Sequence, residues 1–332
     1  MTTTKENFKV VTIGGATMDI SFKTEEGVLI NNKQDVTRQK LVGFEYGAKL
    51  YIEDADFSFG GGAANSAVCF SRLEAAANSM LVVGDDKIGQ AILDNLKTEK
   101  VNVVEPQLSA KSSGLSMILV YGQETRDHVL FAFRGANEDL KIDGAVLENL
   151  RADWIYLSSL SGKSSAGVLN KVFGTAKKQQ IKVAWNPGSQ QIKLGLEELS
   201  PFLKNTQVLI LNKDEAIELV MREKGEGVVN SKNLILELSK YCPGIILVTE
   251  GENGAHAFYV KRFYFEEVKS VKKMDTTGVG DAFGSTFVWA YEFFKGDIQA
   301  ALEVASINAA AVITKQGAQK GLLNKKELLK KL

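Results

Sequence analysis

Short apolar runs alternate with stretches of helical spacing along most of this chain. The apolar runs occupy residues 8–14, 80–83, 154–158, 182–185, 207–211 and 245–249. The helical stretches run from Ala64 to Ala77, Ile88 to Glu99, Ser165 to Gln179, Lys213 to Arg222 and Leu234 to Tyr241. Strands that alternate with helices form βαβ units, whose crossovers make the strands parallel and place helices on both faces of the sheet. We therefore predict a three-layer α/β fold, closed by two further helices near 281–294 and 298–314.

Two stretches break this alternation. Residues 21–58 are polar and rich in turn residues, apart from an alternating segment from Lys49 to Phe59. Residues 113–134 hold two strand-like runs joined by the polar turn at 121–127, which is a hairpin pattern. Both stretches predict a small β-sheet appended to the core, and a lid is the natural interpretation.

The chain shows no sign of a division into two domains. It has only four prolines among 332 residues, and no linker rich in Pro or Ser separates two halves. We predict a single α/β domain over residues 8–323 that carries the lid. The remaining residues, 324–332, are basic and amphipathic, and we interpret them as a solvated terminal helix.

Charge and cysteine usage exclude several classes of protein. Lys and Arg number 40, as do Asp and Glu, so no bulk charge points to nucleic acid or an anionic membrane. No apolar run reaches the roughly 18 residues of a membrane span, and residues 1–10 lack the apolar core of a signal peptide. Cys69 and Cys242 lie far apart and have no metal-ligand spacing. We expect a reducing, cytoplasmic setting, with no nucleic-acid or membrane partner.

The segment Asp275–Phe283, which reads DTTGVGDAF, places two glycines before a strongly apolar helix. Glycines there let backbone N–H groups converge, and the helix dipole adds positive potential, so the place attracts phosphate. The same field would keep the carboxylate of Asp281 ionised. An ionised carboxylate beside a phosphate cradle can take the proton of an alcohol during phosphoryl transfer. The alternative is that Asp281 caps a helix and the glycines only make a turn.

The wider segment resembles the C-terminal signature of the ribokinase-like (PfkB) carbohydrate kinase family, D-T-x-G-A-G-D, with Val279 in place of the usual alanine. The resemblance runs from about residue 8 to about residue 323. It implies a ribokinase-like α/β fold with a β-sheet lid, ATP as the phosphate donor, and Asp281 as the catalytic base. It also implies that the backbone of Gly278, Val279 and Gly280 forms the anion hole.

Matches on the substrate side lie early in the chain. The segment FGGGAAN, with Gly60, Gly61 and Asn65, resembles the family's G-G-x-x-x-N signature. Glycines allow close approach of a polyhydroxy substrate, and Asn65 offers a donor and an acceptor for its hydroxyls. A loop and helix cap is the alternative. Asp19 is similar in position to the family's sugar-binding Asp, and Arg134 after the predicted hairpin could hold a hydroxyl-rich or anionic substrate.

Matches on the nucleotide side follow two predicted strands. Asn212 and Glu215 resemble the N-x-x-E motif, which organises Mg²⁺ and the phosphates largely through water. A helix start with acidic residues is the alternative. The segment with Thr249, Gly251 and Gly254 resembles the V-T-x-G-x-x-G nucleotide loop.

Two further assignments rest on the resemblance alone. Asn308, in the last predicted helix, corresponds to an Asn that the family often has near adenine. The family often binds a monovalent cation beside the anion hole, and Asp275 and Thr277 match the residues involved. The resemblance therefore implies possible K⁺ dependence.

The substrate is left open among several classes. The resemblance implies transfer to a hydroxyl, usually a primary one, of a sugar or nucleoside. Gly62 occupies the position where ribokinases commonly have Lys, which argues against ribose. A monosaccharide kinase is the first hypothesis. A nucleoside kinase would need an aromatic slot, for which Phe131 and Phe133 are candidates unless they pack the lid on the core.

Two other classes of protein remain as alternatives. One is a catalytically silent binding protein on the same fold. Such a protein would have no need to keep Asp281 and the glycines, so their presence argues against this class. An NAD-binding protein is disfavoured because no G-x-G-x-x-G follows the first strand. An exposed lid edge would favour a homodimer through the lid.

Overall fold

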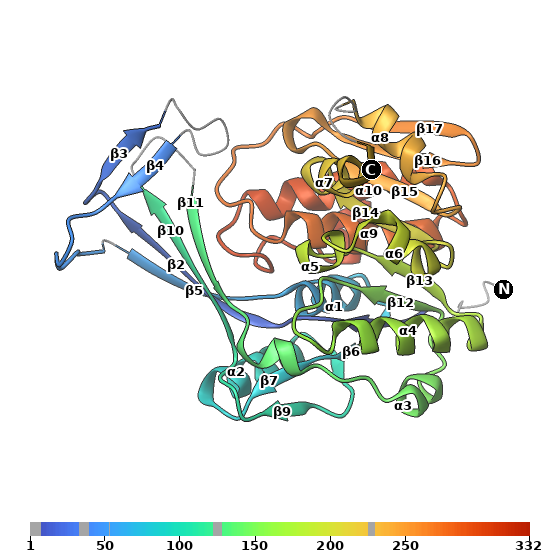
Figure 1. Cartoon of the computed structure of the whole chain (residues 1–332), viewed down its shortest axis with the longest axis horizontal. Coiled ribbons are helices and arrows are strands. Elements are labelled where there is room, and N and C mark those ends of the chain that lie inside the picture. Colours follow the sequence, from blue (N-terminus) through green and yellow to red (C-terminus); the bar gives the residue numbers. More distant parts are fainter. Residues whose placement is uncertain (1–7, 33–39, 53, 122–127, 225–229) are drawn as a thin grey trace.

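A nine-stranded sheet crosses the centre of the protein (Figure 1). The computed structural model describes residues 8–32, 40–52, 54–121, 128–224 and 230–332. The strands, in spatial order, are β17 (Arg262–Glu266), β16 (Ala255–Tyr259), β15 (Ile245–Thr249), β14 (Val208–Asn212), β13 (Lys182–Trp185), β12 (Trp154–Leu157), β1 (Lys9–Ile13), β6 (Ala76–Met80) and β8 (Asn102–Val103). From β15 to β8 every pair is parallel, whereas β16 and β17 are antiparallel. The predicted α/β fold with a mostly parallel sheet is confirmed.

Helices cover both faces of this sheet, which explains why its strands read as nearly continuous apolar runs. Side chains alternate between two cores, so that Val10 faces one and Val11 the other. The first core is shared with α1 (Gly62–Arg72), α2 (Lys87–Thr98), α9 (Val279–Phe293), α10 (Ile298–Ile313) and α11 (Lys325–Leu329). The second is shared with α3 (Gly144–Asn149), α4 (Ser165–Gln179), α5 (Ser189–Ile192), α6 (Gly195–Leu203), α7 (Lys213–Lys224) and α8 (Ser231–Leu238). Within the described residues, no helix is both long enough and apolar enough to cross a bilayer.

Among the described residues, three smaller sheets adjoin this core, and the two that contain β2 and β3 project to the left in Figure 1. A four-stranded sheet, here called the lid, has the order β11 (His128–Phe133), β10 (Gly114–Tyr121), β2 (Thr17–Thr24) and β5 (Asp54–Gly60). The ribbon of β3 (Val28–Asn31) and β4 (Lys40–Gly43) extends it, and β7 (Val82–Gly84) pairs with β9 (Gln107–Ser109) near its base. Two 3₁₀ turns, at Gly135–Asp139 and Gly251–Asn253, complete the elements within the part of the chain that the structure describes.

The structure moves some predicted boundaries. The lid strand β2 begins at Thr17, so the lid reaches closer to the first core strand than the predicted segment 21–58. Residues 33–39 and 53 of that segment, and 122–127 of the predicted turn, lie outside the described residues.

The helix predicted for Ala64–Ala77 ends at Arg72. Glu74 then adopts a left-handed conformation with φ of 64°, which turns the chain into β6. The alanines that favour helix in isolation are overruled by pairing with β1, because the sheet satisfies their backbone groups.

Candidate active site

Two cavities meet at the start of α9. The first, here called the lid-side cavity, has a volume of about 360 Å³ and lies between the lid and the carboxyl ends of the core strands. Its lining residues are Thr17, Asp19, Gly61, Gly62, Asn65, Ser116, Ile118, Leu130, Arg134, Ser158, Ser159, Asn186, Thr276, Thr277, Gly278 and Asp281. These include most of the residues that the sequence predicts on the substrate side. Parallel strands explain the gathering, because their carboxyl ends meet at one edge of the sheet.

The second cavity, here called the core-side cavity, measures about 460 Å³. Its lining residues are Asn212, Thr249, Gly251, Glu252, Gly254, Ala255, Val268, Lys269, Lys273, Thr276, Val279, Gly280, Phe283, Ser306, Ala309, Ala310 and Ile313. Thr276 lines both cavities, whereas Gly278 and Asp281 face the first and Val279 and Gly280 the second. The segment 276–281 therefore forms the wall between them.

Gly278 gives this wall its shape. It is the N-cap of α9 with φ of 73°, and a Cβ there would lie 2.3 Å from the Cβ of Ala318, so only glycine fits. Its missing side chain also means that no side chain caps the helix. The N–H of Val279 makes only a long hydrogen bond to the carbonyl oxygen of Thr276, at 3.4 Å, so the start of α9 can still donate to a ligand at the positive end of the helix dipole.

Asp275 holds the loop in front of this helix start. Its Oδ1 accepts hydrogen bonds from the N–H and the hydroxyl of Thr277, at 2.9 and 2.7 Å. Its Oδ2 accepts one from the N–H of Gly317, at 2.8 Å. The carboxylate therefore ties residues 275–278 to the turn at 317, which lies beside Ala318.

Asp281 lies in the first turn of α9, and its two carboxylate oxygens differ. Oδ2 accepts a hydrogen bond from Nδ2 of Asn65 at 2.8 Å. Oδ1 faces Gly62, since a Cβ at Gly62 would lie 3.4 Å from it. From the sequence we expected the helix field to keep this carboxylate ionised. Instead, burial has the largest effect and raises the pKa of Asp281, while the bond from Asn65 lowers it.

Asp19 belongs to the lid rather than to a turn after the first core strand. It lies on β2, is buried, and accepts a hydrogen bond from Oγ1 of Thr17 at 2.9 Å. Burial raises its pKa. A Cβ at Gly60 would lie 2.1 Å from Oδ2 of Asp19, so Gly60 makes room for this carboxylate without lining the cavity. Gly61, with φ of 92°, does line it.

The end of the hairpin contributes Arg134 to the lining of the lid-side cavity, but not its phenylalanines. Leu130 and Arg134 line the lid-side cavity, and successive residues of a strand point to opposite faces. Phe131 and Phe133 lie on the outer face and are 52% and 53% exposed. They neither form an aromatic slot nor pack the lid on the core, so both interpretations from the sequence are wrong.

Asn212 and Glu215 form a capping box at the start of α7. The N–H of Asn212 donates to Oε2 of Glu215 at 2.9 Å, and the N–H of Glu215 donates to Oδ1 of Asn212 at 2.8 Å. Burial raises the pKa of Glu215, and the charges of Asp214 and Asp281 add to this effect. A cation near Glu215 would therefore be favoured electrostatically.

Asn308 lines neither cavity. Its side chain is fully buried. Nδ2 donates to Oγ1 of Thr286 at 2.8 Å, and Oδ1 accepts from the N–H of Leu323 at 2.9 Å. The residues of α10 that line the core-side cavity are Ser306, Ala309, Ala310 and Ile313. Asn308 joins two helices and the C-terminal segment, and its buried side chain gives no support to the predicted place near a nucleotide base.

Several lining residues escaped the sequence-based prediction. Ser158 and Asn186 directly follow β12 and β13, where a strand-end rule could have found them. A Cβ at Gly62 would lie 2.7 Å from the Cβ of Ser158, so Ser158 fills the space beside this glycine. Ser116 comes from the lid strand β10 and carries no sequence signal of its own.

Known proteins resemble this chain in sequence and in fold. The model of the pfkB family carbohydrate kinases matches residues 7–325. The ribokinase of Bacillus subtilis (strain 168) is 27% identical over 271 residues, which cover 81% of this chain and 86% of that protein. The structure of ribokinase from Giardia lamblia has a TM-score of 0.79 at 18% identity and covers 98% of this chain and 100% of its own. The structure of Arabidopsis thaliana ribokinase complexed with ribose and ATP has a TM-score of 0.75 at 19% identity, covering 98% of both chains.

Proposed function

The chain belongs to the pfkB family of carbohydrate kinases, and we propose that it transfers the γ-phosphate of ATP to a primary hydroxyl of a monosaccharide. As a member of this family it is a phosphotransferase with an alcohol as acceptor. One observation carries the finer proposal. Asp281 and the open start of α9 form the wall between two cavities, so a hydroxyl on one side can meet a phosphate on the other.

In this proposal Oδ1 of Asp281 takes the proton of the substrate hydroxyl. The hydroxyl oxygen bonds to the γ-phosphorus while the bond from that phosphorus to ADP breaks. The N–H groups at Gly278, Val279 and Gly280 stabilise the charge on the transferring group. The products are a phosphorylated sugar and ADP, and Asp281 releases the proton to solvent.

The core-side cavity is proposed to hold ATP, with Thr249, Gly251 and Gly254 along its phosphates or ribose. Mg²⁺ bound with ATP neutralises the phosphate oxygens. Glu215 is proposed to face this ion, chiefly through water, from the first turn of α7 beside Asn212, which lines the cavity. Asp19, Gly61, Asn65 and Arg134 are proposed to bind the sugar.

The lid-side cavity favours a sugar over a nucleoside. Its lining carries hydroxyl, amide and carboxylate groups, and none of its lining residues within the described part of the chain is aromatic. A nucleobase commonly stacks on an aromatic ring, whereas the larger apolar side chains of this lining, Ile118 and Leu130, are aliphatic. Hydroxyl-rich sugars, by contrast, are matched by polar groups that both donate and accept.

A panel of substrates tests the proposal. Monosaccharides, sugar phosphates and nucleosides are offered with MgATP, and ADP release is measured against ATP alone. We expect stimulation by at least one neutral or mildly acidic monosaccharide and none in Asp281→Asn. Stimulation by nucleosides only would favour a nucleoside kinase, and no stimulation by any compound would favour a silent binding protein.

We also propose that K⁺ supports activity. Asp275 and Thr277 hold the loop that leads into the anion hole, and carbonyl oxygens of such a loop suit a monovalent cation. The test is the rate in KCl against the rate in tetramethylammonium chloride at equal ionic strength. Equal rates would exclude this role.

Two copies are proposed to pair through the lid. Phe57, Met117, Phe131 and Phe133 expose a large part of their side chains on its strands, and such exposure marks interaction surfaces. We expect a dimer in light scattering that Phe131→Asp converts to monomer.

The two free cysteines, Cys69 and Cys242, are buried, which agrees with the proposed cytoplasmic setting.

A further inference from the structure

A chain of three side-chain amides lies behind Asp281. Nδ2 of Asn95 donates to Oε1 of Gln319 at 3.0 Å, and Nε2 of Gln319 donates to Oδ1 of Asn65 at 3.0 Å. Nδ2 of Asn65 then donates to Oδ2 of Asp281 at 2.8 Å. We call Asn95, Gln319 and Asn65 the amide chain. Asn65 and Gln319 are 4% and 6% exposed, so water hardly competes for these bonds.

The direction of the amide chain follows from the charge of the base. An ionised carboxylate only accepts hydrogen bonds, so Asn65 must turn its NH₂ toward Asp281. Its carbonyl oxygen then faces Gln319, which must donate, and the carbonyl of Gln319 in turn faces the NH₂ of Asn95. Every amide therefore donates toward the carboxylate. Reversing any one of them would set two donors or two acceptors against each other.

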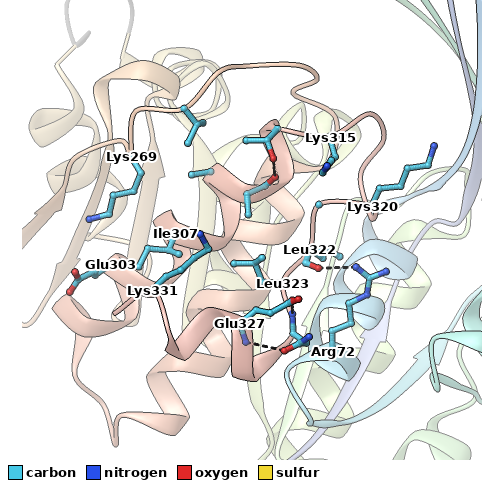
Figure 2. A pocket seen from close by; sticks show the side chains of 16 residues that line it. Arg72, Lys269, Glu303, Ile307, Lys315, Lys320, Leu322, Leu323, Glu327 and Lys331 are labelled. Carbon is cyan, nitrogen blue, oxygen red and sulfur yellow. Dashed lines mark hydrogen bonds between the residues drawn. The ribbon is translucent and has the colours of Figure 1, made fainter.

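The segment that carries Gln319 is anchored by Arg72. Nη1 of Arg72 donates to the carbonyl oxygens of Gln319 and Leu322, each at 2.8 Å, and Figure 2 shows the bond to Leu322. Nε and Nη2 of the same guanidinium bind both carboxylate oxygens of Glu99, at 2.9 and 2.6 Å. Glu99 follows Asn95 by one helical turn, so the end of α2 holds the amide chain both directly and through Arg72.

We propose that Gln319 and Asn95 are positioning residues for Asp281, acting through Asn65 to fix Oδ2 and leave Oδ1 facing the substrate hydroxyl. This inference rests on the proposed function of Asp281 as the base. Neither Gln319 nor Asn95 lines the lid-side or core-side cavity, so they act without touching substrate or nucleotide. A carboxylate held in this way meets the hydroxyl in one orientation, which lowers the entropic part of the barrier.

The amide chain also changes what Asn65 offers to a substrate. From the sequence we expected both a donor and an acceptor for sugar hydroxyls. Because its carbonyl is bonded to Gln319, Asn65 presents mainly its second N–H to the cavity. It therefore selects an acceptor atom of the substrate, which in a sugar is the lone pair of a hydroxyl or ring oxygen.

The variant Gln319→Leu tests the proposal, because leucine nearly fills the volume of glutamine and cannot donate. We expect kcat to fall about five- to tenfold, the effect of one lost buried hydrogen bond, with little change in the KM for ATP. The acidic limb of kcat against pH should move to higher pH, because the bond from Asn65 lowers the pKa of Asp281 and would weaken. Asn95→Leu should do the same to a smaller extent.

Thr206→Ala is the matched control. It removes a side-chain hydrogen bond of a buried residue, from Oγ1 to the carbonyl of Phe202 at 3.0 Å, just before the amino end of β14 and away from the carboxyl strand ends that form the site. It should lower the unfolding temperature without moving the acidic limb. If Gln319→Leu behaves like this control, or like the parent protein, Gln319 is structural and the proposal is overturned.

A readout without turnover separates this proposal from the proposed function. The carboxyl carbon resonance of Asp281, assigned by its loss in Asp281→Asn, reports protonation directly. We expect its midpoint to rise in Gln319→Leu even if no acceptor is phosphorylated, and an unchanged midpoint overturns the role of the amide chain. Should Gln319→Leu not fold, Asn95→Leu carries the same measurement.

Discussion

The starts of α7 and α9 lie on the same core-side cavity, but only α7 has a side-chain cap. At α7, Asn212 and Glu215 cap the helix reciprocally, so the chain satisfies its own N–H groups. At α9, Gly278 has no side chain and no side chain caps the helix. Helix starts carry N–H groups that need partners, and a start left without a cap is costly unless a ligand supplies one.

The difference separates a rigid helix start from one that is ready for a ligand. The capped start fixes Glu215 in the first turn of α7, next to Asn212 at the cavity, and its carboxylate can attract a cation. The open start presents N–H groups where an anion is favoured. A nucleotide with its metal ion carries both charges, so the two helix starts match its two parts. Substitutions at α7 and at α9 can test these two roles separately.

Asp281→Asn should have the largest effect. It removes the base from the open start, and general-base catalysis is worth about 10²–10⁴ in rate. We expect kcat to fall by at least that factor while ATP still binds, as measured by calorimetry. A variant that keeps most of its activity would show that another group takes the proton.

The same variant should be more stable than the parent protein at neutral pH. Burial raises the pKa of Asp281 above its unfolded value, so folding favours the protonated form. That contribution is fully present below the unfolded pKa and is lost as pH rises through the folded pKa. Asparagine stays neutral and avoids the loss. The unfolding temperatures of Asp281→Asn and the parent protein should therefore differ at pH 8 and converge in acid. Equal unfolding temperatures at both pH values would argue that burial does not raise the pKa of Asp281.

Gly278→Ala should have the next largest effect, because it closes the open start. Its Cβ would meet Ala318 and its φ of 73° suits glycine, so we expect a loss of about 1–3 kcal/mol in stability and a large fall in kcat. Gly280→Ala is the matched control, since a Cβ there meets nothing within 4 Å. It should keep or raise stability and change mainly the KM for ATP. Similar losses in both variants would show that the geometry of Gly278 is not special.

Glu215→Gln separates the two roles of this residue, the capping of α7 and the negative charge at its start. Glutamine can keep the capping box but cannot attract a cation. We expect the Mg²⁺ concentration for half-maximal rate to rise about tenfold. The unfolding temperature at neutral pH should not fall and should rise slightly, because burial raises the pKa of the Glu215 carboxyl. An unchanged Mg²⁺ requirement would leave Glu215 with a capping role only.

Asn212→Ala should have the smallest effect. Loss of an N-cap side chain costs about 1 kcal/mol of stability. We expect a lower denaturation midpoint and a modest rise in the KM for ATP, because α7 would fray at the cavity. A fall in kcat as large as that of Gly278→Ala would mean that both helix starts act in the chemical step.

Much of the fold could be predicted from sequence because βαβ alternation is a local pattern with a single common outcome. The antiparallel pair β16 and β17 was missed, since its short strands read like loops beside the stronger runs. The end of α1 was also missed. Alanines at 75–77 favour helix locally, and only pairing with β1 turns them into β6.

The residues of the candidate site also divide into those that a local pattern marks and those that it does not. Asp281, Gly278 and Asn65 stand in short motifs, and the structure brings them together around the lid-side cavity. Gln319 had no motif, and its bond to Asn65 spans 254 positions, so no sequence pattern could reveal it. The place of Asn308 could not be predicted because a buried amide and a ligand-binding amide look alike in one sequence.

Asp19 lies on β2, so the residue proposed to recognise the sugar belongs to the lid and not to the nucleotide-binding core. Substrate recognition would then be inherited together with the lid strands. An exchange of lid strands between related kinases should carry acceptor preference with it, while donor preference stays with the core. Evolution could diversify acceptors on such a scaffold without disturbing the phosphate-transfer machinery, and a protein engineer could follow the same route.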